Sequence, residues 1–186
     1  MNGDKLEWSH VMKYLGCYFQ VNSCRIDIKQ QIRKFYGNFN NVMSVLGRGR
    51  NEMAAVHLVN SYCVPTLTYA CEIWNFSSSD YHTVSVLWNN AFRCIFNCCW
   101  RESTSVLQLY CGCLPMKYII NQQTVLFYRC ISRGSNVVLR SLLHQKVGYV
   151  QSLLSKFNIQ SLSRPKHELK LHIWDTFVSA ETVCHV

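Results

Sequence analysis

Long apolar runs are absent from this sequence of 186 residues, and no uninterrupted stretch approaches the roughly 18 residues that a membrane-spanning helix needs. The first seven residues also lack the apolar core of a secretory signal peptide. The chain contains no internal repeat and no low-complexity tract. These absences lead us to expect an intracellular chain that folds as one globular domain and does not enter a membrane.

Charged residues are scarce as well, at 16% of the chain, and acids are the scarcer kind, with 10 Asp and Glu against 19 Lys and Arg. The net charge of +9 favours a polyanionic partner over a pocket for an acidic small-molecule substrate. The alternative is a merely basic surface. Hydrophobic residues make up 49% of the sequence, which suffices for a substantial core because a chain of this length buries about 70% of its unfolded surface.

Eleven cysteines contrast with the small number of charges. A disulfide scaffold is not expected, because the count is odd and no secretory signal is found. Most of the cysteines neighbour large apolar residues, where a free thiol behaves as a small hydrophobe, so we expect them to be reduced and buried. These are Cys63, Cys71, Cys94, Cys98, Cys99 and Cys130.

Neither a metal site nor a thiol nucleophile is predicted from the cysteines. Cys98 and Cys99 are adjacent, and Cys111 and Cys113 are one residue apart, whereas a zinc knuckle needs a gap of about two to four residues. No cysteine lies in a recognisable nucleophile turn. We therefore expect no metal, no cofactor and no Cys–His catalysis.

The spacing of apolar residues predicts a short β-hairpin followed by helices. Residues 11–19 combine β-favouring side chains with Gly16 at a bend, which favours a two-stranded hairpin within residues 1–24. From Ile26 the period changes, and apolar residues recur at steps of four and three along a helix that ends before Gly47. This seam consists of Ile28, Ile32, Phe35, Phe39, Val42 and Leu46.

Caps and prolines divide the rest of the chain into further helices. Asn51 is expected to cap a helix that stops before Pro65, because the proline ring disfavours helical geometry at Val64. Pro65 suits the first turn of another helix that reaches Trp74. Residues 161–166 are expected to be a linker. The remaining expected helices cover residues 80–99, 103–112, 115–134, 137–146, 149–157 and 168–178. Residues 77–80 offer caps for the first of these, which we expect to be the central helix because apolar residues cover most of its circumference.

The expected fold class is therefore mostly α, a multi-helix bundle with a short N-terminal β-hairpin. Three segments are expected along the chain: the hairpin in residues 1–24, a helical domain in residues 25–134, and short helices with a tail in residues 135–186.

Four short motifs occur in order along the chain. They are Tyr-Leu-Gly at residues 14–16, Pro-Thr-Leu-Thr-Tyr-Ala-Cys-Glu-Ile-Trp at 65–74, Trp-Asn-Asn-Ala-Phe-Arg at 88–93 and Gly-Cys-Leu-Pro at 112–115. In this order they resemble the thumb and post-thumb region of reverse transcriptases of non-LTR (LINE-type) retrotransposons. The second motif is similar to the family's Pro-x-Leu-x-Tyr-Gly-x-Glu-x-Trp pattern, with Ala70 where the family usually has glycine. The resemblance covers about residues 8–132.

The resemblance implies a position beside a catalytic palm that the chain itself lacks. Polymerases of this family bind two metal ions through palm aspartates, including an Asp-Asp pair ahead of the Tyr-Leu-Gly hairpin. Two-metal phosphoryl transfer needs carboxylates that converge on ions about 3.5–4 Å apart. The aspartates of this chain are Asp4, Asp27, Asp80 and Asp175, none adjacent to another. We therefore expect no catalytic residue and no enzymatic activity from the isolated chain.

Basic residues gather on and just after the first long helix, where a thumb would face the nucleic-acid backbone. They are Lys29, Arg33, Lys34, Arg48 and Arg50. Such contacts need only positive charge at phosphate spacing, so binding would be independent of sequence and sensitive to salt. The alternative is a solvated helix face. Tyr14 and Tyr18 are expected to pack across the hairpin rather than against a primer.

Structural roles are assigned to Pro65, Tyr69, Glu72, Trp74 and Arg93. An acid such as Glu72 on an apolar helix is costly to bury unless a cation or backbone donors meet it. Arg93 also lies within an apolar helix, and we hypothesise that the two residues form a buried ion pair; the alternative places Glu72 at the solvent edge. Trp74 and Trp88 are expected to be core anchors.

The sequence therefore predicts a fragment of a retrotransposon RNA-directed DNA polymerase that contacts the template–primer backbone without sequence specificity. The remainder of a reverse transcriptase, or another helical protein, is the other expected partner. Two alternatives stay open. One is a helical protein-interaction module that docks through the apolar seam of residues 28–46, and the other is a decayed fragment with no function of its own.

Overall fold

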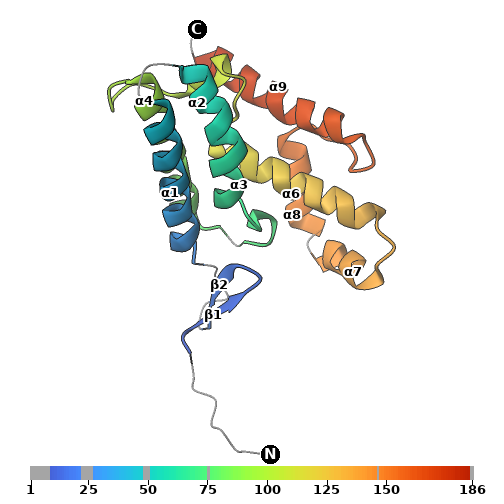
Figure 1. Ribbon diagram of the computed structural model, residues 1–186. Coiled ribbons are helices and arrows are strands. Elements are labelled where there is room, and N and C mark those ends of the chain that lie inside the picture. Colours follow the sequence, from blue (N-terminus) through green and yellow to red (C-terminus); the bar gives the residue numbers. More distant parts are fainter. Residues whose placement is uncertain (1–8, 22–26, 48–50, 75, 146, 185–186) are drawn as a thin grey trace, which may run out of the picture.

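The computed structural model describes residues 9–21, 27–47, 51–74, 76–145 and 147–184. The fold is mostly α-helical with a two-stranded N-terminal hairpin, as the sequence predicts. Figure 1 shows the hairpin at one end of the packed helices and the C-terminus at the other. Within the described ranges, every helix is too short or too polar to cross a lipid bilayer.

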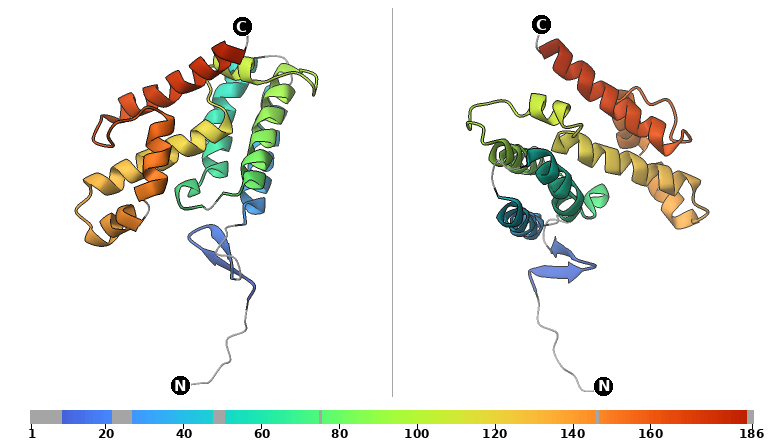
Figure 2. Two further views of the ribbon diagram at one scale, coloured as in Figure 1. Left: turned by 180° about the vertical axis from the view of Figure 1, so that it is seen from behind. Right: turned by 45° about the horizontal axis from the view of Figure 1, so that its top comes forward.

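The hairpin consists of β1 (Val11–Tyr14) and β2 (Cys17–Gln20), which pair antiparallel. The two residues between the strands, Leu15 and Gly16, have positive φ values of 44° and 83°. Two successive left-handed residues are typical of the type I′ turn, whose twist matches that of paired strands. In both views of Figure 2 the hairpin lies beyond the N-terminal end of α1 (Lys29–Leu46).

The apolar seam predicted on α1 faces the chain's own core. Phe35 and Phe39 are buried, and their rings stack with centroids 6.1 Å apart. The other seam residues are partly buried against the same core. The hypothesis that this seam docks onto a separate partner is therefore wrong, because the interior of the chain already covers it.

The helix that begins after Asn51 runs through Pro65 without the expected break. Its parts are α2 (Glu52–Leu58), the π-helical turn η1 (Val59–Cys63) and α3 (Val64–Leu67). Val64, which we expected to be non-helical, has φ −59° and ψ −45°, and its N–H bonds the Val59 carbonyl five residues back. In an α turn the proline ring would clash with the carbonyl four residues earlier, and the wider π turn makes room for the ring.

The single helix predicted from Pro65 to Trp74 is also wrong, because the chain leaves the helix after Leu67. Ala70 interrupts it with a left-handed backbone of φ 59° and ψ 20°. A 3₁₀ turn, η2 (Cys71–Ile73), follows, and Trp74 is extended. Left-handed backbone favours glycine, so an alanine gives no sequence signal for this turn.

Replacing Ala70 by glycine is expected to stabilise the fold. An L side chain with φ of 59° is strained, and relief of that strain exceeds the extra entropy of an unfolded glycine, so the free energy of unfolding should rise by about 1 kcal/mol. Urea denaturation followed by circular dichroism measures the change. The matched control is Ala54→Gly inside α2, which should lower stability by about 1 kcal/mol. Destabilisation by both variants would contradict the prediction.

Side-chain caps start two of the helices as the sequence predicts. The Asn51 side chain accepts a hydrogen bond of 2.9 Å from the Ala54 N–H at the start of α2. Ser77 and Asp80 form a reciprocal capping box at the start of α4 (Ser78–Phe96). α4 is the central helix that we expected, with buried residues on several sides: Val84, Leu87, Trp88, Ala91, Phe92 and Ile95.

The remaining helices follow the predicted order, and α6 links the two parts of the core. They are α5 (Ser105–Tyr110), α6 (Met116–Arg133), α7 (Val137–Gln145), α8 (Val147–Lys156) and α9 (Lys166–Cys184). Val125 of α6 packs with Phe157, Leu169 and Ile173 in a second apolar cluster. The predicted segment boundary at residue 134 is thus crossed by shared core packing.

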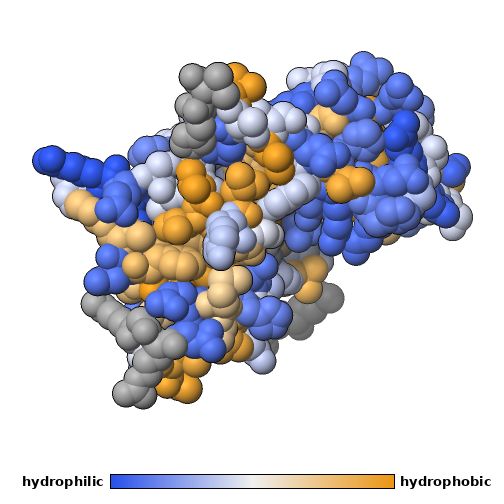
Figure 3. All heavy atoms as spheres, turned by 90° about the horizontal axis from the view of Figure 1, so that it is seen from above, coloured by the Kyte–Doolittle hydropathy of each residue, from blue (hydrophilic) through white to orange (hydrophobic). Residues whose placement is uncertain are grey.

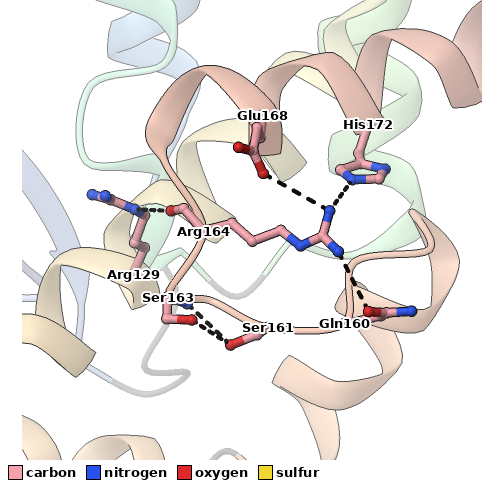
Figure 4. Close-up of polar contacts among 7 residues, drawn as sticks. All are labelled: Arg129, Gln160, Ser161, Ser163, Arg164, Glu168 and His172. Carbon is pink, nitrogen blue, oxygen red and sulfur yellow. Dashed lines mark hydrogen bonds and ion pairs between the residues drawn. The ribbon is translucent and has the colours of Figure 1, made fainter.

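The connection from α8 to α9, expected to be a linker, is fixed by hydrogen bonds (Figure 4). Arg129 Nε on α6 donates to the Arg164 carbonyl at 2.8 Å. The Arg164 guanidinium contacts the His172 Nε2 at 2.9 Å and lies 3.9 Å from Glu168 Oε2. It also donates to the Gln160 side-chain oxygen at 3.3 Å. These contacts hold the start of α9 against α6.

The cysteines whose side chains the structure describes are free thiols, but not all are buried. Cys63 and Cys71 are buried as predicted, and burial raises the pKa of the Cys63 thiol to about 11. Cys94 and Cys98 are partly exposed, and Cys99 and Cys130 are exposed, so the prediction is wrong for these four. Cys99 follows the end of α4, and Cys130 lies on the solvent side of α6.

Candidate nucleic-acid interface

The first two sequence motifs contact each other through residues that lie 54 positions apart in the chain. The Tyr69 hydroxyl donates a hydrogen bond of 2.9 Å to the Leu15 carbonyl in the hairpin turn. The Tyr69 ring lies so close to Gly16 that a side-chain carbon there would be 3.3 Å from it. Tyr69 therefore ties the hairpin to the helical part of the chain, which gives the structural role predicted for it a mechanism.

Two further side chains, Trp74 and Lys34, act on the hairpin through Cys17 of β2. Cys17 of β2 is buried, and burial raises the pKa of its thiol, while the Trp74 indole N–H and the Lys34 ammonium act in the opposite direction. Both groups therefore lie close to Cys17. The buried Trp74 N–H forms no well-aligned hydrogen bond. Trp74 is 9% exposed and Trp88 is 1% exposed, so both are core anchors as predicted.

The last two motifs also contact each other. The indole N–H of Trp88 donates to the Leu114 carbonyl at 3.1 Å. The Asn89 side-chain oxygen accepts from the buried Gln108 amide at 2.9 Å. The motif of residues 88–93 thus holds the chain segment that leads to Gly-Cys-Leu-Pro at 112–115.

The expected ion pair between Glu72 and Arg93 is not formed. The Arg93 guanidinium donates instead to the Glu102 carbonyl, at 3.1 and 3.3 Å, and to the Asn90 side-chain oxygen at 2.9 Å. Among the described residues the only ion pair joins Arg164 and Glu168. Glu72 is half-buried in η2 and carries its charge without a paired cation. Its alternative placement, at the solvent edge, agrees better with this geometry.

Three of the predicted basic residues, Lys29, Arg33 and Lys34, are exposed on α1. Lys29 and Arg33 are one helical turn apart, so their side chains lie on the same face. α1 contains no Asp or Glu, and none of the three forms an ion pair with a described residue. Arg48 and Arg50 lie outside the described residues. The structure therefore brings together three cations without ion pairs on the first turn and a half of α1, with the Asp27 carboxylate at its start, 3.0 Å from the Lys29 backbone nitrogen.

The hairpin adds groups that the sequence reasoning missed. Lys13 of β1 lies 5.7 Å from the centroid of the Tyr18 ring, and Lys34 lies beside β2. The Tyr18 carbonyl accepts a hydrogen bond of 2.8 Å from the Asp27 N–H, so the hairpin brings this charge and aromatic ring close to the start of α1. Only the strand register could have revealed that Lys13 lies beside the Tyr18 ring, because the register pairs these two residues.

Of the two hairpin tyrosines, Tyr18 packs across the strands against Lys13, as predicted for it, and Tyr14 does not pack against Tyr18. Tyr14 pairs with Cys17, one register position from the Lys13 and Tyr18 pair, so Tyr14 and Tyr18 project from opposite faces. Tyr14 is 60% exposed. On α1, Tyr36 is exposed as well. These two rings leave exposed aromatic surface near the basic residues.

Metal binding has no visible site in the described part of the chain, where no three His, Cys, Asp or Glu side chains are grouped to hold an ion. Comparison of the chain with known protein families, with curated protein sequences and with solved structures finds no match.

Proposed function

We propose that this chain is the thumb and post-thumb part of a LINE-type reverse transcriptase, and that it contacts the template–primer backbone through α1 and the adjoining hairpin. The observation that carries the proposal is the set of exposed, unpaired cations Lys29, Arg33 and Lys34 on a helix without acids. Such a surface attracts phosphates through charge alone and does not read base sequence. The chain acts here as a binding element and not as a catalyst.

The backbone at Ala70 supports the resemblance on grounds independent of residue identity. The family pattern usually has glycine at this position, and Ala70 has a left-handed backbone with φ of 59°. Glycine is the residue that adopts this conformation without strain. The contact between Tyr69 and Leu15 is further support, since it joins two of the motifs that carry the resemblance.

Fluorescence anisotropy with a labelled RNA–DNA primer–template tests the proposal. Each phosphate contact releases counterions, so the affinity should fall steeply between low and physiological salt. Two duplexes of unrelated sequence should bind with equal affinity, because backbone contacts carry no sequence information. A folded chain that shows no binding at low salt would overturn the proposal.

A second candidate function, a protein-interaction module, is favoured by exposed apolar residues at one end of the molecule. This end contains the C-terminus of α1, the N-terminus of α2 and the segment after α4 (Figure 1). Apolar side chains gather on its surface (Figure 3). The exposed large hydrophobic residues of these segments are Val45, Met53, Trp100, Val106 and Tyr110. Monomeric proteins rarely expose large contiguous apolar patches. This candidate predicts binding that does not weaken with salt, so the same titration separates the two functions.

A further inference from the structure

A cavity of about 390 Å³ lies between η2, α4, α6 and α8, away from the basic surface of α1. This volume is within the range of small-molecule sites, which is roughly 300–1,000 Å³. Ile73 and Tyr149 are about half exposed and lie at its opening, whereas Trp74 and Tyr128 are buried in its walls. The described residues that line it include no Lys, Arg or His.

Half of the described residues that line the cavity are aromatic, and their rings form two groups. In the first, the Phe76 ring lies 5.0 Å from Trp74 and 4.8 Å from Tyr81, measured between centroids. In the second, the Tyr128 ring lies 5.8 Å from Phe127 and 6.4 Å from Tyr149. Each ring carries negative charge density on its face, so a cavity bounded by such rings attracts a cation.

The phenol groups of this wall are neutral at physiological pH. Burial raises the pKa of Tyr81 to about 12, and it also raises the pKa values of Tyr128 and Tyr149. The tyrosines therefore offer ring faces and hydroxyl groups but no formal charge.

Glu72 supplies the formal charge, as the one acid among the described residues that line the cavity. Its carboxylate has no hydrogen bond or ion pair with any described residue. Glu72 also borders a larger, open hollow between α3, α6 and α9, where Lys170 and His167 lie, but neither comes within ion-pairing distance of it. Glu72 lies at the edge of the cavity with its carboxylate unpaired, so it is available to attract a cation that enters.

We propose that this cavity binds a quaternary ammonium group. A primary ammonium is strongly hydrated and a guanidinium carries five N–H donors, so both would lose hydrogen bonds to water that ring faces do not replace. A quaternary ammonium has no donor to satisfy, and its methyl groups pack against aromatic faces. The group comes either from a free small molecule such as choline or from a trimethylated lysine of a protein. The inference goes beyond the proposed nucleic-acid contact and does not depend on it.

The test compares choline with dimethylbutanol, its neutral carbon analogue of the same shape. Each is titrated into the full ¹⁵N-labelled chain at constant ionic strength, and the indole N–H signal of Trp74 is followed by NMR. Choline should bind at least about fivefold more tightly than dimethylbutanol, because only the cation interacts with the rings and the carboxylate. Equal binding of the two, or no binding of choline, would overturn the inference.

Three variants distinguish the contribution of the Glu72 charge from that of the Tyr149 ring. Glu72→Gln keeps the shape of the side chain and should weaken choline binding about fivefold while leaving dimethylbutanol binding unchanged. Tyr149→Leu removes a ring at the opening and should weaken choline binding, whereas the matched Tyr149→Phe should bind choline within about twofold of the unmodified chain. Because Tyr149 is half exposed, both variants should fold. An unchanged choline affinity in Glu72→Gln would contradict the proposal.

Peptides identify the source of the ammonium group. If a peptide with trimethyllysine binds much more tightly than choline, the source is a protein side chain; if the two bind alike, a free small molecule suffices. Either result supports the cavity as a quaternary ammonium site. The same peptide with unmodified lysine should bind at least about fivefold more weakly, and equal binding would overturn the inference.

Discussion

Glutamine in place of Lys29, Arg33 and Lys34 together is expected to weaken binding to a primer–template duplex by one to two orders of magnitude at low salt. The three side chains are exposed on α1, and none is neutralised by a described acid. Each lost phosphate contact lowers the slope of log affinity against log salt by about 1, so the slope should fall by about 2 to 3. Anisotropy titrations over a range of salt concentrations measure both quantities.

The matched control removes the same charge from other helices. Arg140 of α7 and Lys166 and Lys170 of α9 are exposed, and their replacement by glutamine also lowers the net charge by three. If binding depends on the site and not on total charge, this control should retain most of the affinity. Equal losses in the two triple variants would show that α1 is not the binding face. Circular dichroism establishes that both variants keep their helices.

Alanine in place of Trp88 is expected to remove a large part of the stability of the fold. Trp88 is 1% exposed, its ring packs edge-on against Phe92 at 5.0 Å, and its N–H bonds the Leu114 carbonyl. Truncation of a buried tryptophan costs about 3–5 kcal/mol. Since domains are stable by only about 5–15 kcal/mol, urea denaturation should show a much lower midpoint or an unfolded chain.

Two further substitutions divide this effect into its parts. Trp88→Phe keeps a buried ring but leaves the Leu114 carbonyl without its donor, so it should cost less than Trp88→Ala, about 1–3 kcal/mol. Trp100→Ala is the surface control, because Trp100 is 73% exposed, and it should change stability by less than about 0.5 kcal/mol. If Trp100→Ala lowered the free energy of unfolding as much as Trp88→Ala, the result would contradict the placement of Trp88 in the core and Trp100 on the surface.

Local signals explain what the sequence predicted correctly. The hairpin, the central helix and the caps at Asn51 and Ser77 depend on residues within a few positions of one another, and the structure has all of them. The apolar period of α1 also predicted which side of that helix is buried. What it could not tell is whether the chain itself or another protein covers that side.

Two errors were local, because the helix continues through Pro65 and then breaks at Ala70, and others concern contacts between different segments of the chain. Arg93 bonds the Glu102 carbonyl rather than Glu72, because the loop after α4 folds back over it. The bond from Tyr69 to Leu15 and the aromatic cavity likewise depend on tertiary placement. Periodicity and spacing describe one helix at a time, so they carry no information about which groups of different helices meet.

The π-helical turn η1 also sets the rotational angle between α2 and α3. Val56 of α2 and Leu67 of α3 are both buried, although a proline lies between them. One residue of an α-helix turns the chain by about 100°. Loss of a single residue from η1 would keep every other side chain and yet rotate Leu67 away from α1, against which α3 packs. Unlike a surface loop, this segment is therefore more sensitive to its length than to the identity of its exposed residues.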